Sequence, residues 1–304
     1  MAESLVVLGL DAADYELVRK WDCENLLLSS HREIETFAHS IEVPSTLEVW
    51  PTIATGCTPT EHGVILHPED QDRHPLYTTL VRANQLLPDV VRTKILSLKQ
   101  ETIGSSFPTT DHSHVFDSGA VYNWPGVTGC SDWSQESDWF AAVTDGEMTE
   151  QAFRQKQFGH AGKGVGWLAG QATAGVPIVG AHVHLLDHMG HIYASRPEHL
   201  RRAYLAVDSL VGWLREHVDR LVIVSDHGMQ TTALDDAEPG VHSWRAMIAT
   251  TESGPLPDHV VDIRGWLEER LEKSDAGSIT DQMDRESTTS VDAPRQHLED
   301  LGYL

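Results

Sequence analysis

The chain has 304 residues, which is enough for one large domain or two small ones with a substantial buried core. Its 46 acidic and 22 basic side chains give a formal net charge of −24, which repels nucleic-acid backbones and anionic membrane surfaces. We therefore expect neither a nucleic-acid polymer nor a membrane as a partner. An acidic, lysine-poor composition is also typical of halophilic archaeal proteins, whose self-repulsion is screened by salt, and we favour this interpretation over an ordinary acidic protein.

The three cysteines, Cys23, Cys57 and Cys130, are odd in number and far apart in the sequence. They predict neither a disulfide framework nor a cysteine-based zinc site. Residues Met1–Ser4 carry no basic stretch and lead straight into an apolar run, which argues against a signal peptide. No apolar run approaches the ~18 residues of a membrane-spanning helix. We therefore expect a soluble cytoplasmic protein.

Short apolar runs alternate with segments of helical periodicity along the chain, which predicts parallel strands joined by helices. The expected strands are Leu5–Leu10, Glu33–Ala38, Pro177–Leu186, Leu221–Val224 and Trp244–Ala249. The expected helices are Asp14–Trp21, Leu47–Thr55, Met148–Ala169, Arg196–Val218 and Val260–Glu272. This pattern indicates an α/β fold with a mostly parallel central sheet and helices on both faces.

Two regions lack clear periodicity and are expected to lie outside this core. Residues 67–145 have mixed character, and we interpret them as a small inserted cap beside a catalytic domain that covers residues 1–272. From residue 273 the composition turns polar, so residues 273–304 are predicted to form an acidic polar tail. The apolar residues of Pro294–Leu304 would let this tail end in a short helix.

Three of the expected strands are followed by an aspartate, and histidines lie close behind or on a later loop. The aspartates are Asp11, Asp187 and Asp226, and the histidines are His191, His227 and His242. Because the carboxyl ends of parallel strands meet at one edge of a sheet, we expect these side chains to converge. Carboxylates and imidazoles without a thiolate suit Zn²⁺, and Mn²⁺ or iron is also compatible with them.

Four ordered blocks make the sequence similar to the alkaline phosphatase superfamily, in its type I phosphodiesterase/nucleotide pyrophosphatase branch. The blocks are Gly9–Asp11, Thr46 with Thr55–Gly63, Asp187 with His191, and Ser225–Gly228 with His242. Together they span residues 5–250, which is most of the chain. One departure from the usual pattern is Glu48, an extra carboxylate close to Thr46 that could alter the preference for metal or substrate.

The resemblance implies an alkaline-phosphatase-like fold and a metal-dependent hydrolase of phosphate esters, most similar to phosphodiesterases and nucleotide pyrophosphatases. It also implies two divalent ions, which we expect to be Zn²⁺ with Mn²⁺ as the alternative. The residues that match the ligands of one ion are Asp187, His191 and His242, and those that match the ligands of the other are Asp11, Thr46, Asp226 and His227. The expected partner is a small phosphate-ester substrate.

Thr46 matches the nucleophile of the family. Coordination to a divalent cation lowers the pKa of a hydroxyl group, and a helix that begins at this residue adds backbone N–H groups for phosphate oxygens. We expect a covalent phospho-Thr46 intermediate, which water at the second ion then hydrolyses with net retention at phosphorus. Ser45 is an alternative nucleophile, but the spacing to Thr55–Gly56 favours Thr46.

The remaining candidates are expected to have supporting roles. His62 is predicted to shape its loop. Tyr122 and Trp124 could line a substrate pocket, but their place near a strand end favours core aromatics. His182 and His184 share a strand face, so we expect them to pack near the ligands rather than bind metal. The histidines expected at the surface or at the rim of a pocket are His112, His114, His160 and His188.

Three other functions fit parts of the pattern. A sulfatase-like hydrolase shares the fold, but Glu61 replaces the arginine of the Cys-x-Pro-x-Arg pattern that starts at Cys57, and Cys57 lies beyond the expected helix. A phosphoglycerate-mutase-like phosphotransferase would prefer serine as its nucleophile and would need a larger inserted domain. A metal-bound structural or binding protein would not require Thr46 together with the full ligand set. We therefore favour the hydrolysis of phosphate esters.

Overall fold

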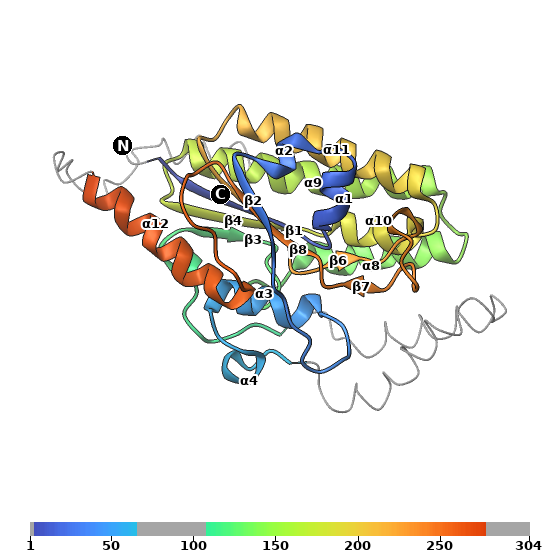
Figure 1. Cartoon of the computed structure of the whole chain (residues 1–304), viewed down its shortest axis with the longest axis horizontal. Coiled ribbons are helices and arrows are strands. Elements are labelled where there is room, and N and C mark those ends of the chain that lie inside the picture. Colours follow the sequence, from blue (N-terminus) through green and yellow to red (C-terminus); the bar gives the residue numbers. More distant parts are fainter. Residues whose placement is uncertain (1–2, 66–107, 278–304) are drawn as a thin grey trace, which may run out of the picture.

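The structure is a computed structural model that describes residues 3–65 and 108–277, with side chains described up to residue 272. The first part of the expected cap, residues 67–107, lies outside the described residues, as does the tail from residue 278 with its expected terminal helix. Figure 1 shows the chain coloured from its N-terminus to its C-terminus, with helices and strands labelled.

A six-stranded sheet forms the centre of the described chain, with strand order β2-β8-β5-β1-β4-β3. Its strands are β1 Leu5–Leu10, β2 Ser30–Ile34, β3 Ala120–Tyr122, β4 Ile178–Val183, β5 Arg220–Val224 and β8 Ala246–Thr250. Strands β3, β4, β1 and β5 are parallel, whereas β8 is antiparallel to β5 and β2 is antiparallel to β8. The predicted mostly parallel sheet is therefore confirmed.

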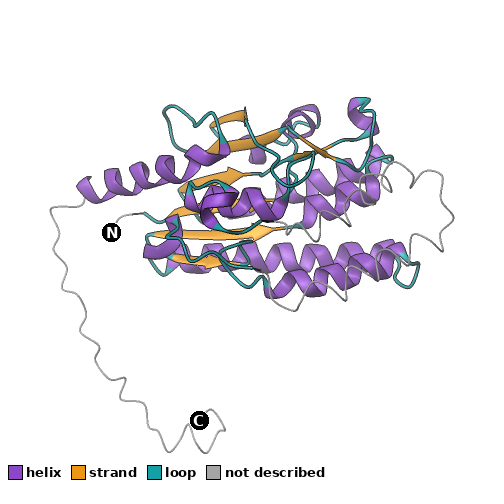
Figure 2. Cartoon of the chain, turned by 90° about the horizontal axis from the view of Figure 1, so that it is seen from below, coloured by secondary structure: helices purple, strands orange, loops and turns teal. Residues whose placement is uncertain are grey.

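Helices cover both faces of this sheet, as Figures 1 and 2 show. The helices of the first face are α1 Tyr15–Lys20, α2 Glu24–Leu27, α8 Ser131–Thr144, α9 Glu150–Thr173, α10 Leu185–Tyr193 and α11 Pro197–Arg215. Those of the second face are α3 Thr46–Thr55 and α12 Ile263–Gly277, and the short helix α4 Pro59–His62 follows α3. None of the described helices combines the length and the apolarity needed to cross a bilayer.

Strand β1 lies in the middle of the sheet and alternates between two apolar cores. Val6, Leu8 and Leu10 contribute to the core under the first helical face. Leu5 and Val7 contribute to the core on the second face. Because side chains of successive strand residues point to opposite faces, a strand buried on both sides is a continuous apolar run, as this one is.

Gly9 interrupts that run because α3 packs very close to β1. A Cβ atom on Gly9 would lie 2.8 Å from the ring of Trp50 and 3.3 Å from the ring of Trp124. These two rings meet edge to face, and the Trp124 ring N–H donates to the Trp50 carbonyl oxygen at 3.1 Å. The close approach brings the first residue of α3, Thr46, to the carboxyl end of β1, where its hydroxyl lies 3.3 Å from Asp11.

The main differences from the predicted elements concern β4 with α10, β2 and α8. Strand β4 ends at Val183 and α10 begins at Leu185, so Asp187 lies in the first turn of a helix; apolar residues at the helix start had extended the predicted strand. Strand β2 ends at Ile34 and thus lies earlier than the predicted strand Glu33–Ala38. Helix α8 is not predicted at all, because its mixed sequence has only a weak apolar face.

The described part of the expected cap contributes to the core fold. Strand β3 pairs in parallel with β4 at the edge of the main sheet, and α8 packs beside α9 on the first face. Trp124, which follows β3, is completely buried in the second core, so the prediction of a core aromatic is confirmed there. Tyr122 is only partly buried and packs against the first core.

We expect replacement of Gly9 by alanine to destabilise the fold. The added methyl group would collide with the buried Trp50 ring, so the free energy of unfolding should fall by about 1–3 kcal/mol. Gly159→Ala in α9 is the matched control, because nothing lies within 4 Å of the added atom and alanine favours helix, which should raise stability by up to about 1 kcal/mol. Urea unfolding measures both, and equal shifts would contradict the close α3–β1 contact.

Candidate metal centre

Polar side chains gather at the carboxyl ends of β1, β4 and β5, the edge at which parallel sheets form ligand sites. Strand β8 begins at the same edge because it is antiparallel to β5. The small antiparallel pair β6 Gly228–Met229 and β7 His242–Ser243 connects β5 to β8 there. The structure brings together all seven residues predicted for the site, which are Asp11, Thr46, Asp187, His191, Asp226, His227 and His242.

The first group of candidate ligands consists of Asp11, Asp226 and His227, which are all fully buried. Their ligand atoms lie within 4.8 Å of one another. His227 Nε2 lies 3.4 Å from Asp11 Oδ1 and 3.2 Å from Asp226 Oδ2. The hydroxyl of Thr46 joins them, since its Oγ1 lies 3.3 Å from Asp11 Oδ1 and 3.2 Å from His227 Nε2.

Contacts with the backbone fix the direction of these side chains. His227 Nδ1 donates to the carbonyl oxygen of Gly228 at 3.0 Å, which leaves Nε2 with a lone pair towards the carboxylates. Asp226 Oδ1 accepts from the Ala12 N–H at 3.3 Å. Asp226 Oδ2 has no hydrogen-bond donor among the described residues. A buried carboxylate oxygen without a donor is costly, and a bound cation would remove that cost.

The second group consists of Asp187, His191 and His242. Helix α10 places Asp187 and His191 one turn apart on the same face, and His242 comes from β7. His191 Nδ1 donates to the Gly240 carbonyl at 2.9 Å, and His242 Nδ1 donates to the Pro44 carbonyl at 2.8 Å. Both Nε2 atoms therefore carry lone pairs, and each lies 3.3 Å from Asp187 Oδ1 and 3.3 Å from the other. Three acceptors that meet at one point favour a cation between them.

The two groups are adjacent. The rings of His227 and His242 stack with their centroids 3.8 Å apart and their planes 16° from parallel. Asp11 from the first group and Asp187 from the second also approach each other through His184, because ligand atoms of these three lie within 4.8 Å. All the candidate ligands therefore belong to one continuous cluster of carboxylates and imidazoles.

Burial and mutual repulsion dominate the electrostatics of the cluster. Burial and the neighbouring Asp226 carboxylate raise the pKa of Asp11 well above its usual range, and burial raises the pKa of Asp226 to about 7. Burial also acts to raise the pKa of Asp187, but His191 and other histidines outweigh it and hold that pKa well below its usual range. Burial acts to lower the pKa of His242, but the Asp187 carboxylate outweighs it and raises that pKa.

A partly buried ion network that the sequence does not reveal holds the loops of this site. Asp14 caps α1, and its Oδ2 accepts from the Met229 N–H at 3.1 Å, the Ser243 hydroxyl at 2.9 Å and Arg245 Nε at 2.8 Å. The guanidinium of Arg245 also pairs with Asp236 at 2.8 Å. The network therefore ties α1 to β6, which follows His227, and to β7, which contains His242.

His182 and His62 have the supporting roles predicted for them, and Glu48 has a structural contact that was not predicted. His182 is buried, and its Nε2 lies 3.0 Å from Asp11 Oδ2, so it holds the oxygen of Asp11 that faces away from Thr46. His62 shapes its loop by accepting a hydrogen bond from the backbone N–H two residues later. The extra carboxylate of Glu48 is buried and accepts from the Ser40 N–H at 3.2 Å, so it anchors the loop before α3.

One histidine contradicts its prediction, and another has a contact that was not predicted. His188 was predicted to lie at the surface or at a pocket rim, and this is wrong: it is 5% exposed, because α10 turns it towards the interior. His184 packs near the ligands, but its Nε2 lies 3.1 Å from Asp187 Oδ2 and its Nδ1 lies 3.6 Å from Glu136 Oε2. Glu136 is 4% exposed and is not among the predicted site residues. His112 is exposed, as expected.

These features define an α/β protein with carboxylates, imidazoles and one hydroxyl group clustered at a sheet edge. The family model for type I phosphodiesterase / nucleotide pyrophosphatase matches residues 5–299. The chain therefore belongs to the type I phosphodiesterase/nucleotide pyrophosphatase family, and the resemblance found in the sequence is confirmed. A search of curated proteins gave no significant match.

Similar solved structures include murine ectonucleotide pyrophosphatase / phosphodiesterase 5, which is 14% identical with a TM-score of 0.37 over 75% of this chain and 58% of that chain. An inactive form of the same murine protein in complex with AMP gives 14% identity and a TM-score of 0.38 over 75% and 57%. The PH0037 protein from Pyrococcus horikoshii is 11% identical with a TM-score of 0.43 over 94% and 100%. The chain thus spans less than two thirds of the murine protein.

The position of Cys57 separates this chain from the sulfatase pattern. Cys57 follows Gly56 at the C-terminal end of α3, whereas Thr46 begins that helix beside the candidate ligands. Because α3 has 10 residues, its two ends lie about 15 Å apart. A formylglycine made from Cys57 would therefore be remote from the cluster.

We expect Asp226→Asn to change protein stability in opposite directions with and without metal. Burial raises the pKa of Asp226 from the usual 3.8 to about 7 in the folded chain. Between these pH values the folded state binds a proton that the unfolded state has lost. The stability of the wild type therefore falls as pH rises from about 4 to 7. In chelator at pH 8, the neutral asparagine should therefore be more stable, by up to roughly 4 kcal/mol. In excess Zn²⁺ the wild type should be the more stable.

Urea unfolding at pH 4 and pH 8, with and without Zn²⁺, measures this reversal. Asp219→Asn removes an exposed aspartate and serves as the control, which should match the wild type in every condition. If the free energy of unfolding of Asp226→Asn equals that of the wild type at both pH values, with and without Zn²⁺, Asp226 is neither a destabilising buried carboxylate nor a metal ligand.

Proposed function

We propose that the protein is a metal-dependent phosphodiester hydrolase of the phosphodiesterase/nucleotide pyrophosphatase type, with Thr46 as its nucleophile. The observation that carries this proposal is the contact of the Thr46 hydroxyl with Asp11 and His227 at the start of α3. A nucleophilic oxygen, candidate cation ligands and the free N–H groups of a helix N-terminus then lie at one point, which is what phosphoryl transfer requires.

Two divalent cations, which we assign as Zn²⁺ with Mn²⁺ as the alternative, fit the donors of the two groups. The residues that would hold one cation are Asp11, Thr46, Asp226 and His227, and those that would hold the other are Asp187, His191 and His242. The fit is supported by the unpartnered oxygens Asp226 Oδ2 and Asp187 Oδ1 and by the Nε2 lone pairs that face them. When bound, such cations lower the pKa of hydroxyl groups and neutralise phosphate charge.

The surroundings of Thr46 suit an in-line attack on phosphorus. Asp11 Oδ1 and His227 Nε2 are the two acceptors beside the Thr46 hydroxyl, and either can take its single proton, which then goes to the leaving alcohol oxygen. The attack forms a bond between phosphorus and the Thr46 oxygen, and the bond to the leaving alcohol breaks on the opposite side. The remaining phosphate oxygens then face the first N–H groups of α3, where the helix dipole stabilises negative charge.

Hydrolysis of phospho-Thr46 completes the reaction. Water forms a new bond to phosphorus, the bond to the Thr46 oxygen breaks, and a phosphate monoester leaves while the hydroxyl is restored. Each of the two displacements inverts the configuration at phosphorus, so their sum is retention. The net charge of −24 supports a small ester, such as a nucleotide or another small diester, rather than a nucleic-acid polymer as substrate.

Ser45 is less suited to be the nucleophile. It is the N-cap residue of α3, and its carbonyl oxygen accepts from the N–H groups of Glu48 and Val49 at 2.9 Å. Thr46 is the residue whose hydroxyl contacts both Asp11 and His227. The geometry therefore supports the preference for Thr46 that the sequence spacing indicates.

We expect Thr46→Ala to reduce the turnover of bis(nitrophenyl) phosphate at least about 10³-fold, because the attacking oxygen is lost. Thr46→Ser should retain measurable turnover, since it keeps a hydroxyl group at the same position. The assay is the release of nitrophenol in high salt with added Zn²⁺ or Mn²⁺.

Ser45→Ala is the matched control, and its turnover should stay within a few-fold of the wild type. If Thr46→Ala keeps full turnover, Thr46 is not the nucleophile. If Ser45→Ala alone abolishes turnover, the neighbouring serine has that role.

We also expect metal removal to abolish the activity. We further expect the protein to hydrolyse phosphate esters in preference to sulfate esters. Dialysis against a chelator should eliminate hydrolysis of the phosphodiester, and Zn²⁺ or Mn²⁺ should restore it. The matching nitrophenyl sulfate should be a much poorer substrate under the same conditions. Metal-independent turnover, or faster hydrolysis of the sulfate, would contradict the proposed function.

A further inference from the structure

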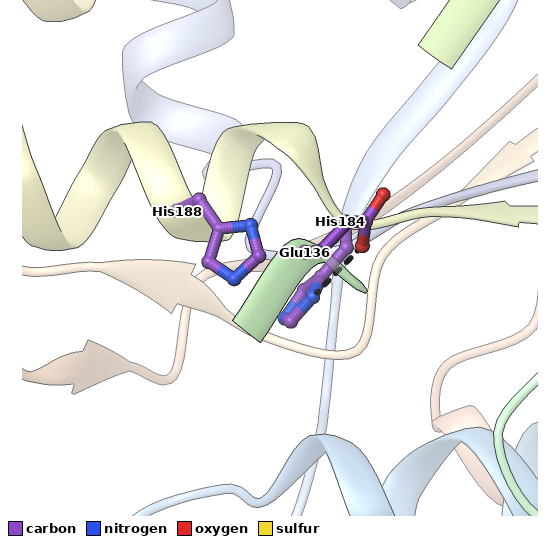
Figure 3. A group of neighbouring side chains, drawn as sticks. All are labelled: Glu136, His184 and His188. Atoms are coloured by element: carbon purple, nitrogen blue, oxygen red, sulfur yellow. Dashed lines mark ion pairs between the residues drawn. The ribbon is translucent and has the colours of Figure 1, made fainter. Parts of the chain in front are cut away.

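A third group of ligand-type side chains lies beside the candidate metal centre, formed by Glu136, His184 and His188 (Figure 3). Glu136 comes from α8, His184 stands directly before α10, and His188 lies within α10. Their ligand atoms lie within 4.8 Å of one another, and the three residues are 4%, 5% and 5% exposed. Glu136 and His188 are absent from the residues that match the ligands of the family.

In each of these three residues, an atom of a type that can bind metal lacks a hydrogen-bond partner. Glu136 Oε2, His184 Nδ1 and His188 Nδ1 are buried and have no hydrogen-bond partner among the described residues. Buried polar atoms are nearly always paired, so three unpaired atoms in one small group require an explanation. His184 Nδ1 and Glu136 Oε2 form an ion pair at 3.6 Å, the dashed line in Figure 3, but this distance is too long for a good hydrogen bond.

Two of these side chains are held in place through their other polar atom. Glu136 Oε1 is held by His160 Nδ1 at 3.0 Å, so the carboxylate has one fixed and one unpaired oxygen. His184 Nε2 lies 3.1 Å from Asp187 Oδ2, to which it can donate its proton. A histidine whose distal nitrogen donates to a carboxylate presents the other nitrogen as a metal ligand. The outer contacts therefore leave Glu136 Oε2 and His184 Nδ1 facing each other.

We propose that Glu136, His184 and His188 bind a third divalent transition-metal cation, separate from the two cations assigned to the candidate metal centre. Two imidazoles and one carboxylate are a donor set that suits Zn²⁺. One cation satisfies all three unpaired atoms at once. It also joins α8 to α10 and, through His184, positions Asp187, so the third site supports the second group without touching the substrate.

A proton or a water molecule explains the group less well. A proton on His184 Nδ1 could serve Glu136, but it would leave His188 Nδ1 unpaired. A small polar cavity beside Glu136 has room for about one water molecule, but neither His184 nor His188 lines it. Water in that cavity could reach the glutamate and not the two imidazoles.

The amount of bound zinc tests the proposal on the full-length protein. After dialysis against Zn²⁺ and removal of free metal, Glu136→Gln and His188→Asn should each contain about one zinc per chain less than the wild type. Glu147→Gln makes the same chemical change at an exposed glutamate just after α8 and should contain as much zinc as the wild type. Equal zinc in all four proteins would overturn the proposal.

The same experiment separates the third site from the proposed catalytic cations. Asp226→Asn disturbs the first group, so the double variant with Glu136→Gln should contain about one zinc less than Asp226→Asn alone. That difference is expected whatever reaction the protein catalyses. If the double variant and Asp226→Asn contain equal zinc, the third site does not exist, even where the hydrolase activity is confirmed.

Anomalous scattering from wild-type crystals grown with Zn²⁺ provides a test that needs no variant. A peak at the zinc edge should lie between Glu136 and His188, in addition to any peak at Asp11 or Asp187. This measurement also decides the case in which the variants fail to fold. The absence of a peak at the third position, in crystals saturated with zinc, would overturn the proposal.

Discussion

The burial of several like charges at one edge of the sheet is the constraint on which the site depends. Asp11, Asp187 and Asp226 are each at most 5% exposed, and carboxylates repel one another strongly where water is excluded. Part of that repulsion is relieved by protons, as the raised pKa values of Asp11 and Asp226 indicate. Imidazoles relieve another part around Asp187. Divalent cations would relieve more of it, so metal binding should stabilise the folded state.

Holding such a cluster requires a rigid frame, and the frame consists of few contacts. The parallel strands β1, β4 and β5 bring the segments after them to one edge, while the missing side chain of Gly9 lets α3 approach until Thr46 reaches Asp11. The ion pair of Asp14 with Arg245 and the hydrogen bonds of Asp14 to β6 and β7 hold these two strands against α1. Sheet register, one glycine and one partly buried ion pair thus determine the position of the candidate ligands.

The sequence predicted the sheet and the grouping of three aspartates with three histidines from local signals, which are buried apolar runs and the polar residues that follow them, whereas Thr46 was assigned through the family resemblance. It did not predict Glu136 or the burial of His188, because both depend on helices. Apolar residues at the start of α10 extended the predicted strand, which left His188 in a loop instead of one turn from His184. Glu136 lies three residues after Trp133 and four before Phe140, which places it on the same helix face as these aromatic residues. This position was the only sign in the sequence that Glu136 is buried, and it is a weak one.

The buried carboxylates share one arrangement, in which one oxygen is anchored by the protein and the other faces a cluster of ligand atoms. In Asp187, Oδ2 is held by His184 while Oδ1 faces the imidazoles of the second group. Glu136 repeats the arrangement, with Oε1 held by His160 and Oε2 unpaired. His184 connects the two, because one ring nitrogen contacts Asp187 and the other faces Glu136. A positive charge at Glu136 would strengthen the His184 donor and thereby orient Asp187, so the outer group is placed to support the inner one.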